Sequence, residues 1–180
     1  MTIRKILRMG HPTLRQKARQ VTIEELKAPE FTELISDMIE TLHNSGGIGL
    51  AAPQIDVPIR MAIIEIQGGD SRYGVIPSIP MTVFINPTIE VISPTEMGYW
   101  EGCLSIPGLR GFVERPQGIR VDALNRHGEQ ISMELNGFLA TVFQHEFDHL
   151  DGKLYIDYIQ NRELLVFEEE YEQFILNREG

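Results

Sequence analysis

The sequence contains one cysteine, Cys103, among 180 residues. A lone thiol cannot form a disulfide within the chain, so we exclude a disulfide-stabilised secreted fold and expect a reducing compartment. Long apolar runs are also missing: nowhere do about 18 consecutive apolar residues, the length of a membrane span, occur. The first residues, MTIRKILRMGHPTLRQ, lack an apolar run of signal-peptide length. We therefore expect a cytoplasmic protein without a membrane partner.

Positive charge is scarce. The chain has 16 Lys and Arg residues against 26 Asp and Glu residues, which gives a formal net charge of −10. Because nucleic acids and anionic membrane surfaces attract basic proteins, this balance argues against direct binding to either.

The chain also lacks internal repeats and low-complexity linkers, which would indicate several units. With 180 residues, of which 42% are hydrophobic, it has enough apolar material for one well-buried core. We therefore expect a single domain over residues 1–180.

Periodic patterns predict the main elements. Apolar residues recur every three or four positions in PEFTELISDMIETLHNSGG, residues 29–47, which predicts a helix that begins near Pro29 and ends at the glycines. Residues 118–135 contain two alternating runs around NRHG, which favours a hairpin. Short segments rich in Ile and Val predict strands at 59–66, 81–87 and 88–93.

Two further helices are expected, at 138–150 and at 161–176. The order of elements predicts a single compact α+β domain, with largely antiparallel sheets packed around a central helix and with a C-terminal helix. The central helix, 138–150, is also the expected metal-binding helix.

That helix contains QHEFDHL, residues 144–150, in which two histidines lie four positions apart. On a helix this spacing places His145 and His149 on one face, where both imidazoles can bind one metal ion. Glu146 lies beside them and could exchange a proton with a water molecule at the metal. The competing interpretation is a coincidence of two core histidines and a surface glutamate. Helix, spacing and acid occur together, so we favour the metal site.

A catalytic zinc-type site uses three protein ligands and one open position. A metzincin-like extension fails, because Tyr155 occupies the place of the third histidine. A thermolysin-like site could use a later glutamate. The acidic run that would supply it is more simply a solvated helix face; its members are Glu168, Glu169 and Glu170.

The remaining candidate ligand is Cys103 in WEGCLSIPG. Gly102 beside it would let the backbone approach a metal closely. A lone intracellular cysteine is, however, more often a small buried hydrophobe than a ligand. The residues alone leave the third ligand open.

Three segments, GIGLAAPQ (47–54), EGCLS (101–105) and QHEFDHL (144–150), resemble in order and separation the three signature motifs of the peptide deformylase family. GHPTLRQKA, FINP and DGKLYIDY extend the resemblance over nearly the whole chain. It implies a compact α+β metalloenzyme that removes the N-formyl group from the initiator methionine of nascent polypeptides and releases formate. The alternative is a zinc endopeptidase of the HExxH type.

By motif, the resemblance implies that Cys103, His145 and His149 bind one divalent metal and that Glu146 is the general acid and base. One thiolate and two imidazoles can bind several divalent ions. The resemblance favours Fe²⁺ in the cell, with Zn²⁺, Ni²⁺ or Co²⁺ as replacements. The expected donors to the oxyanion are the side chain of Gln54 and the backbone N–H of Leu104.

The substrate groove is also implied. Gly49 matches a backbone position at the formyl end, Glu101 and Arg115 match a supporting acid–arginine pair, and Arg110 matches an arginine near the groove. Phe138, Thr141 and Val142 share the helix face of His145. With Ile48 and Tyr99 they would form a pocket for the methionine side chain, although ordinary core packing is the alternative for each residue. The expected substrate-binding residues are Ile48, Gly49, Tyr99, Glu101, Gly102, Arg110, Phe138, Thr141 and Val142.

The implied partners are formyl-methionyl nascent peptides, met transiently at the ribosome. Some deformylases carry a basic C-terminal helix for ribosome docking, whereas this chain ends in FEEEYEQFILNREG. Ribosomal RNA would repel this acidic tail, so docking by that route is not expected. Whether the loop at 67–80 covers the groove is left open by the sequence.

Overall fold

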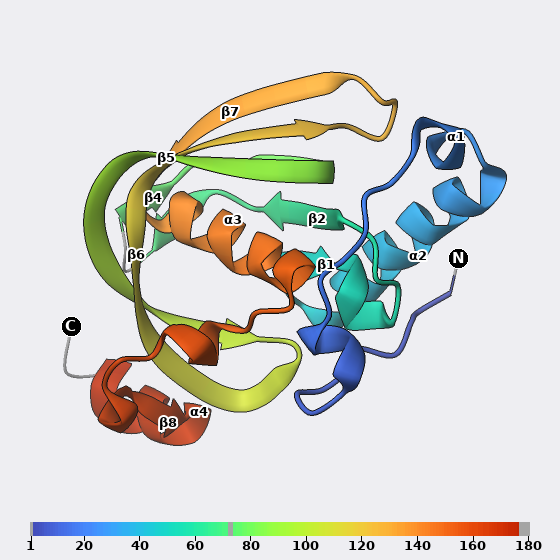
Figure 1. The fold of residues 1–180 in the computed structure, drawn as a ribbon. Coiled ribbons are helices and arrows are strands. Elements are labelled where there is room, and N and C mark those ends of the chain that lie inside the picture. The colour runs from blue at the N-terminus through green and yellow to red at the C-terminus, as the bar shows by residue number, and fades with distance from the viewer. Residues whose placement is uncertain (1, 72–73, 177–180) are drawn as a thin grey trace.

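The computed structural model describes residues 2–71 and 74–176 of the chain (Figure 1). Two residues of the loop at 67–80 and the last four residues of the acidic tail lie outside this description. The N-terminal segment contains a 3₁₀ turn, η1 (Pro12–Arg15), and a short helix, α1 (Ile23–Leu26).

Helix α2 (Pro29–Ser45) confirms the first predicted helix. Pro29 occupies its first turn, where a missing N–H costs nothing. Gly46 ends it in the left-handed conformation, with φ 68°, which glycine adopts without strain. Its buried face packs against the first strands of the sheet and makes one of the two main cores; its members include Phe31, Ile35, Met38 and Leu42.

The main sheet is antiparallel throughout, with the order β1-β2-β5-β6-β7. A sixth strand, β8, pairs with β6 beyond the reach of β7, and β3 and β4 form a separate small hairpin. A 3₁₀ turn, η2 (Ala52–Ile55), follows the first strand. The strands are β1 (Gly49–Ala51), β2 (Met61–Ile66), β3 (Gly69–Ser71), β4 (Gly74–Ile76), β5 (Ile79–Cys103), β6 (Ile106–Leu124), β7 (Gln130–Asn136) and β8 (Leu165–Phe167).

Strands β5 and β6 are long and strongly curved, and they bend around the central helix (Figure 1). The segments predicted as separate strands at 81–87 and 88–93 belong to the single strand β5. Its pairing with β6 shifts register at several points, and such bulges bend a strand and increase its twist. The predicted hairpin is confirmed, with Leu124 paired to Gln130 across the turn.

Helix α3 (Phe138–Asp148) lies within this curved sheet and packs against it (Figure 1). Three phenylalanines hold it there: Phe84 of β5 contacts Phe143 and Phe147, with ring centroids 5.1 and 5.8 Å away. The predicted α+β fold with a central helix is therefore confirmed. The helix continues into a 3₁₀ turn, η3 (His149–Asp151).

The C-terminal segment differs from the predicted helix at 161–176. After the turns η4 (Tyr155–Tyr158) and η5 (Arg162–Leu164), residues Leu165–Phe167 form β8, and helix begins only at α4 (Glu168–Glu170), followed by the π turn η6 (Tyr171–Ile175). The apolar sequence Leu-Val-Phe meets the free edge of β6, where strand pairing outweighs a weak helical period. Among the described residues, no helix is both long and apolar enough to span a membrane.

Candidate active site

Three side chains meet where the end of β5 faces α3. The ligand atoms of Cys103, His145 and His149 all lie within 4.8 Å of one another. The Sγ atom of Cys103 is 3.3 Å from Nε2 of His149. His149 lies just past the last helical residue but keeps helical dihedral angles, φ −57° and ψ −30°, so the four-residue spacing still places both histidines on one face.

The chemistry of these donors fits a divalent metal. Burial alone would raise the pKa of the Cys103 thiol, but the charge of His149 and hydrogen bonds with both histidines outweigh it, and the pKa lies well below its usual range. The thiolate, which is the form that binds metals, is therefore favoured. One thiolate and two imidazoles leave an open position, as in catalytic rather than structural sites.

The buried ion pair of Glu101 and Arg115 holds the ring of His145 in place. Nδ1 of His145 hydrogen-bonds Oε2 of Glu101 at 2.7 Å, which leaves Nε2 for a metal. Arg115 donates to both oxygens of Glu101, at 2.6 and 3.1 Å. Burial alone would raise the pKa of Glu101, but His145 and Arg115 outweigh it and lower the pKa. The structure thus brings the predicted acid–arginine pair together.

Glu146 lies beside the three donors and is only 6% exposed. Burial raises the pKa of its carboxyl group, and its Oε2 atom has no hydrogen-bond partner among the described residues. Gly49 of β1 lies directly against it: a Cβ atom at this glycine would be 2.4 Å from the carboxyl carbon of Glu146. A buried, unpaired carboxyl oxygen beside metal-binding groups is free to accept a proton.

Gln54, in η2, points its carboxamide into the same space. Its Oε1 atom accepts a hydrogen bond from the N–H of Ala51 at 2.8 Å, so the amide cannot turn over. Its Nε2 atom donates to Oγ of Ser105 at 3.1 Å and lies 3.7 Å from Sγ of Cys103. Ser105 was not singled out from the sequence, although it closes the EGCLS motif.

These groups open into a cavity of about 540 Å³. Most predicted site residues line it, but two do not. His149 is buried and is not part of the lining, and Tyr99 packs edge-on against Phe138, with ring centroids 5.7 Å apart. Tyr99 thus lies directly behind the lining residue Phe138, and its place in the methionine pocket stays a prediction. The predicted residues in the lining are Ile48, Gly49, Gln54, Glu101, Gly102, Cys103, Leu104, Arg110, Phe138, Thr141, Val142, His145 and Glu146.

Glu168 was considered from the sequence only as an alternative metal ligand, and its place in the cavity lining was not predicted. Glu168 reaches the cavity because β8 pairs with β6, and its Oε1 atom accepts hydrogen bonds from Nε of Arg110, at 2.9 Å, and from Nη2. Further lining comes from residues 45–47 at the end of α2, from Trp100 of β5 and from residues 106–109 at the start of β6. The position of Glu168 depends on the pairing of β8 with β6, which no local motif indicates.

A family model described as polypeptide deformylase matches residues 3–164. The chain belongs to the peptide deformylase family. A peptide deformylase of Leptospira biflexa serovar Patoc (strain Patoc 1 / Ames) is 41% identical over 170 residues, which cover 94% of this chain and 95% of the relative. Peptide deformylase 1 of Bordetella pertussis is 46% identical over 153 residues, 85% of each chain.

Solved deformylase structures share the fold. That of Synechococcus elongatus, in complex with actinonin, has a TM-score of 0.79 and 33% identity, and the match covers 96% of this chain and 86% of that one. A Met-Ala-Ser-bound class I type b deformylase from Acinetobacter baumannii has a TM-score of 0.81 and 33% identity, with 88% and 99% covered.

Deformylases are metal-dependent hydrolases, and removal of the formyl group from formyl-methionyl nascent peptides is the function of this chain. The comparisons do not favour the alternative, an endopeptidase. Of the acidic run that was the alternative source of a third ligand, Glu168 is engaged elsewhere, because it binds Arg110.

Proposed function

We propose that deformylation takes place at Cys103, His145 and His149, which hold one divalent ion, Fe²⁺ in the cell, replaceable by Zn²⁺, Ni²⁺ or Co²⁺. The observation that carries this proposal is the convergence of one sulfur and two imidazole donors, within 4.8 Å of one another, beside an unpaired buried carboxyl oxygen. When bound, the ion supplies Lewis acidity and lowers the pKa of water toward about 7.

Glu146 moves the proton. As the general base it takes a proton from the attacking water, and as the general acid it delivers that proton to the departing methionine amine. Its raised pKa suits both tasks, because a carboxyl group with an ordinary pKa holds a proton too weakly to return it near neutral pH. Gly49 allows the carboxyl group to lie close to the reacting formyl carbon.

Gln54 and Leu104 stabilise the developing oxyanion. The Nε2 donor of Gln54 is pre-oriented, because its Oε1 atom is held by Ala51 and its Nε2 atom by Ser105. The N–H of Leu104 follows the ligand Cys103 in the chain and is the proposed second donor. Loss of one such donor typically lowers the rate about a hundred-fold to a thousand-fold.

The methionine side chain occupies the apolar wall that Ile48, Phe138 and Val142 form beside the proposed ligands. A flexible thioether fits such a wall, and the close approach of Gly49 to Glu146 leaves little room for an acyl group larger than formyl. The Met-Ala-Ser complex of the Acinetobacter baumannii deformylase, a related fold, supports a peptide in this groove.

The remaining proposals concern the extent of the catalytic domain, the substrates and the place where they are met. We propose that residues 1–180 act as one catalytic domain, and the contact of Glu168 with Arg110 beyond the family-matched residues supports this. The substrates are formyl-methionyl nascent chains, met transiently at the ribosome in the cytoplasm, where such chains are made.

The test is formate release by anaerobically purified protein loaded with Fe²⁺ or Ni²⁺. A formyl-Met tripeptide is compared with its acetyl-Met counterpart and with an internal peptide. We expect formate from the formyl substrate alone. Glu146→Gln should lower kcat about a hundred-fold or more with unchanged metal content, whereas Glu134→Gln, at an exposed glutamate of β7, should not. Internal cleavage without formate would contradict the proposal.

A further inference from the structure

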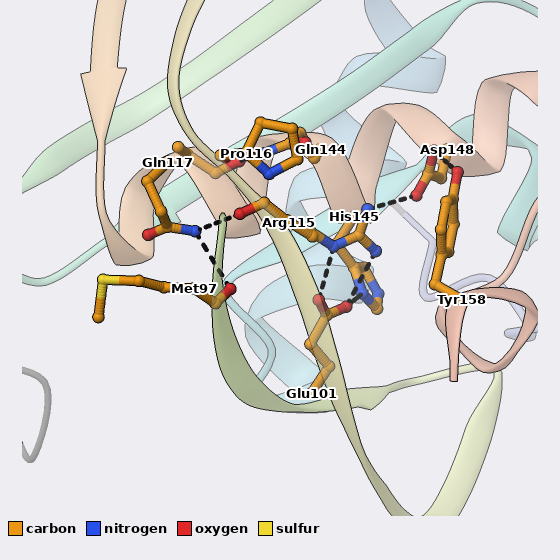
Figure 2. Close-up of polar contacts among 10 residues, drawn as sticks. Met97, Glu101, Arg115, Pro116, Gln117, Gln144, His145, Asp148 and Tyr158 are labelled. Atoms are coloured by element: carbon orange, nitrogen blue, oxygen red, sulfur yellow. Dashed lines mark hydrogen bonds and ion pairs between the residues drawn. The ribbon is translucent and has the colours of Figure 1, made fainter. Parts of the chain in front are cut away.

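Arg115 of β6 connects the proposed metal site to Asp148, a partly buried carboxylate at the end of α3 (Figure 2). It is 3% exposed, and its Nε and Nη2 atoms both donate to Glu101. Its remaining terminal nitrogen, Nη1, donates to Oδ2 of Asp148 at 2.7 Å. One guanidinium group therefore joins two carboxylates that lie on different elements.

Asp148 is the last residue of α3 and lies three positions after His145 and directly before His149. Its second oxygen, Oδ1, accepts a hydrogen bond from the hydroxyl of Tyr158 at 2.8 Å. The ring of Tyr158 also covers Arg115, whose guanidinium carbon lies 4.7 Å from the ring centroid. Burial raises the pKa of Tyr158, so it keeps the proton that it donates.

The strand that carries Arg115 is also braced. Gln117 donates to the carbonyl of Arg115 at 2.7 Å, and Gln144 of α3 donates to the carbonyl of Pro116 at 2.8 Å (Figure 2). The side chain of Arg115 and the carbonyl of its neighbour Pro116 are thus both held against α3.

These contacts form a closed path. It leaves α3 at His145, passes through Glu101 of β5 and Arg115 of β6, and returns to α3 at Asp148. All four carboxylate oxygens of the two acids accept hydrogen bonds, so neither acid can rotate without breaking one. The ring of His145 can therefore turn only if the whole path loosens.

The balance of charges gives a second reason why Asp148 should affect His145. Glu101, Asp148 and Arg115 sum to one negative charge, and a divalent ion with one thiolate sums to one positive charge. Without Asp148, the positive charge of Arg115 would be matched by Glu101 alone, and Glu101 would attract the N–H of His145 less strongly. Carboxylates behind a ligating histidine set its orientation and its basicity.

We propose that Asp148 and Tyr158 are positioning residues for His145: acting through Arg115 and Glu101, they hold its ring so that Nε2 faces the metal. They touch neither substrate nor metal. This inference rests on the proposed role of His145 as a ligand. According to this inference, Asp148 and Tyr158 help to retain the metal and do not help to bind the peptide.

The experiment uses Co²⁺-loaded full-length chain and follows metal loss to a chelator, the visible absorption of the bound Co²⁺, and kcat and KM separately. Asp148→Asn should speed Co²⁺ loss about tenfold or more, shift the absorption bands and lower kcat while KM stays unchanged. Tyr158→Phe, which removes one hydroxyl, should change the same quantities less.

Asp151→Asn is the matched control. Asp151 lies two residues after His149 and pairs with Arg60 at 2.7 Å, outside the path. It should leave Co²⁺ loss and the absorption bands as in the unaltered chain. If Asp148→Asn does not fold, Tyr158→Phe decides the question against the same control.

Two results would overturn the inference. If Asp148→Asn and Tyr158→Phe lower only the thermal midpoint, while Co²⁺ loss and absorption match the control, the path is merely a structural ion-pair network. If the unaltered chain binds no Co²⁺ at all, the proposed ligand set fails, and this inference fails with it.

Discussion

Gly49 of β1 faces the carboxyl group of Glu146 so closely that a Cβ atom would lie 2.4 Å from its Cδ and Oε1 atoms. Gly49→Ala must therefore push this carboxyl group away from its buried position. A displacement of about 1 Å in a catalytic group can cost about a hundred-fold in rate. We expect kcat for a formyl-Met peptide to fall by about that factor, with unchanged metal content, as measured by formate release and metal analysis.

Gly102→Ala is the matched comparison. A Cβ atom at Gly102 would also be too close to a neighbour, 2.4 Å from Nη1 of Arg110. That atom is the end of a flexible, half-buried side chain, so it can move aside. We expect a rise in KM and little change in kcat. Equal losses of kcat in both variants would mean that Glu146 is not the sensitive group.

Local spacing explains which site residues could be predicted at this scale. His145, Glu146 and His149 lie on one helix, so their relation follows from helical geometry. The contact of Arg115 with Asp148 depends instead on how β6 packs against the end of α3, which local spacing does not specify. Asp148 belongs to the QHEFDHL motif and could have been suspected, but Tyr158 lies on a turn whose position no local pattern specifies.

Among the elements, α1 depends on a capping box. Glu25 accepts the N–H of Thr22 and both terminal nitrogens of Arg19, and Thr22 caps the N–H of Glu25 in return. The hydrogen bonds from Arg19, followed by that of Thr22, lower the pKa of Glu25 from 4.5 to about 2. The folded state therefore binds the proton more weakly than the unfolded state, and the stabilisation is present above pH 4.5.

We expect this contribution to disappear as the pH falls from about 4.5 to about 2. Glu25→Gln should lower the urea midpoint at pH 7, and the difference from the unaltered chain should shrink steadily through this window. Urea titrations from pH 7 down to the acid limit of solubility measure it. Glu33→Gln, on the exposed side of α2, controls for the loss of one negative charge. A difference that grows on acidification would contradict the assignment.

The C-terminal segment covers the only tryptophan of the sequence. Trp100 is 8% exposed and packs against Tyr171, with ring centroids 5.0 Å apart. Removing residues 165–180 should expose this indole and release Arg110 from Glu168. We expect a red shift of the tryptophan emission with metal binding retained, whereas removal of residues 177–180 alone should leave the emission unchanged. Unchanged emission after the longer truncation would contradict the packing.

The C-terminal segment also shows which helices and strands could not be predicted from the sequence. Residues 29–47 carry a long amphipathic period and Pro and Gly end signals, so the sequence alone indicated α2. Residues 165–167 are too few to show a period, and their conformation is decided by pairing with Leu109–Gly111 of β6. The length of β5 was missed for the same reason, since Pro87 and Pro94 looked like strand ends but lie at bulges in a curved strand.

At the scale of the whole molecule, the chain has a net charge of −10, whereas the cavity lining contains the neutralising pair Arg110 and Glu168. The long-range field should therefore attract basic peptides and repel acidic ones. We expect kcat/KM for a formyl-Met-Ala-Lys-Lys peptide to exceed that for formyl-Met-Ala-Glu-Glu by about tenfold at low salt, with similar kcat values. Raising the salt to about 1 M, where the screening length is about 3 Å, should abolish the difference. A preference that persists in high salt would place its origin in a direct contact, and Glu168→Gln would then identify it.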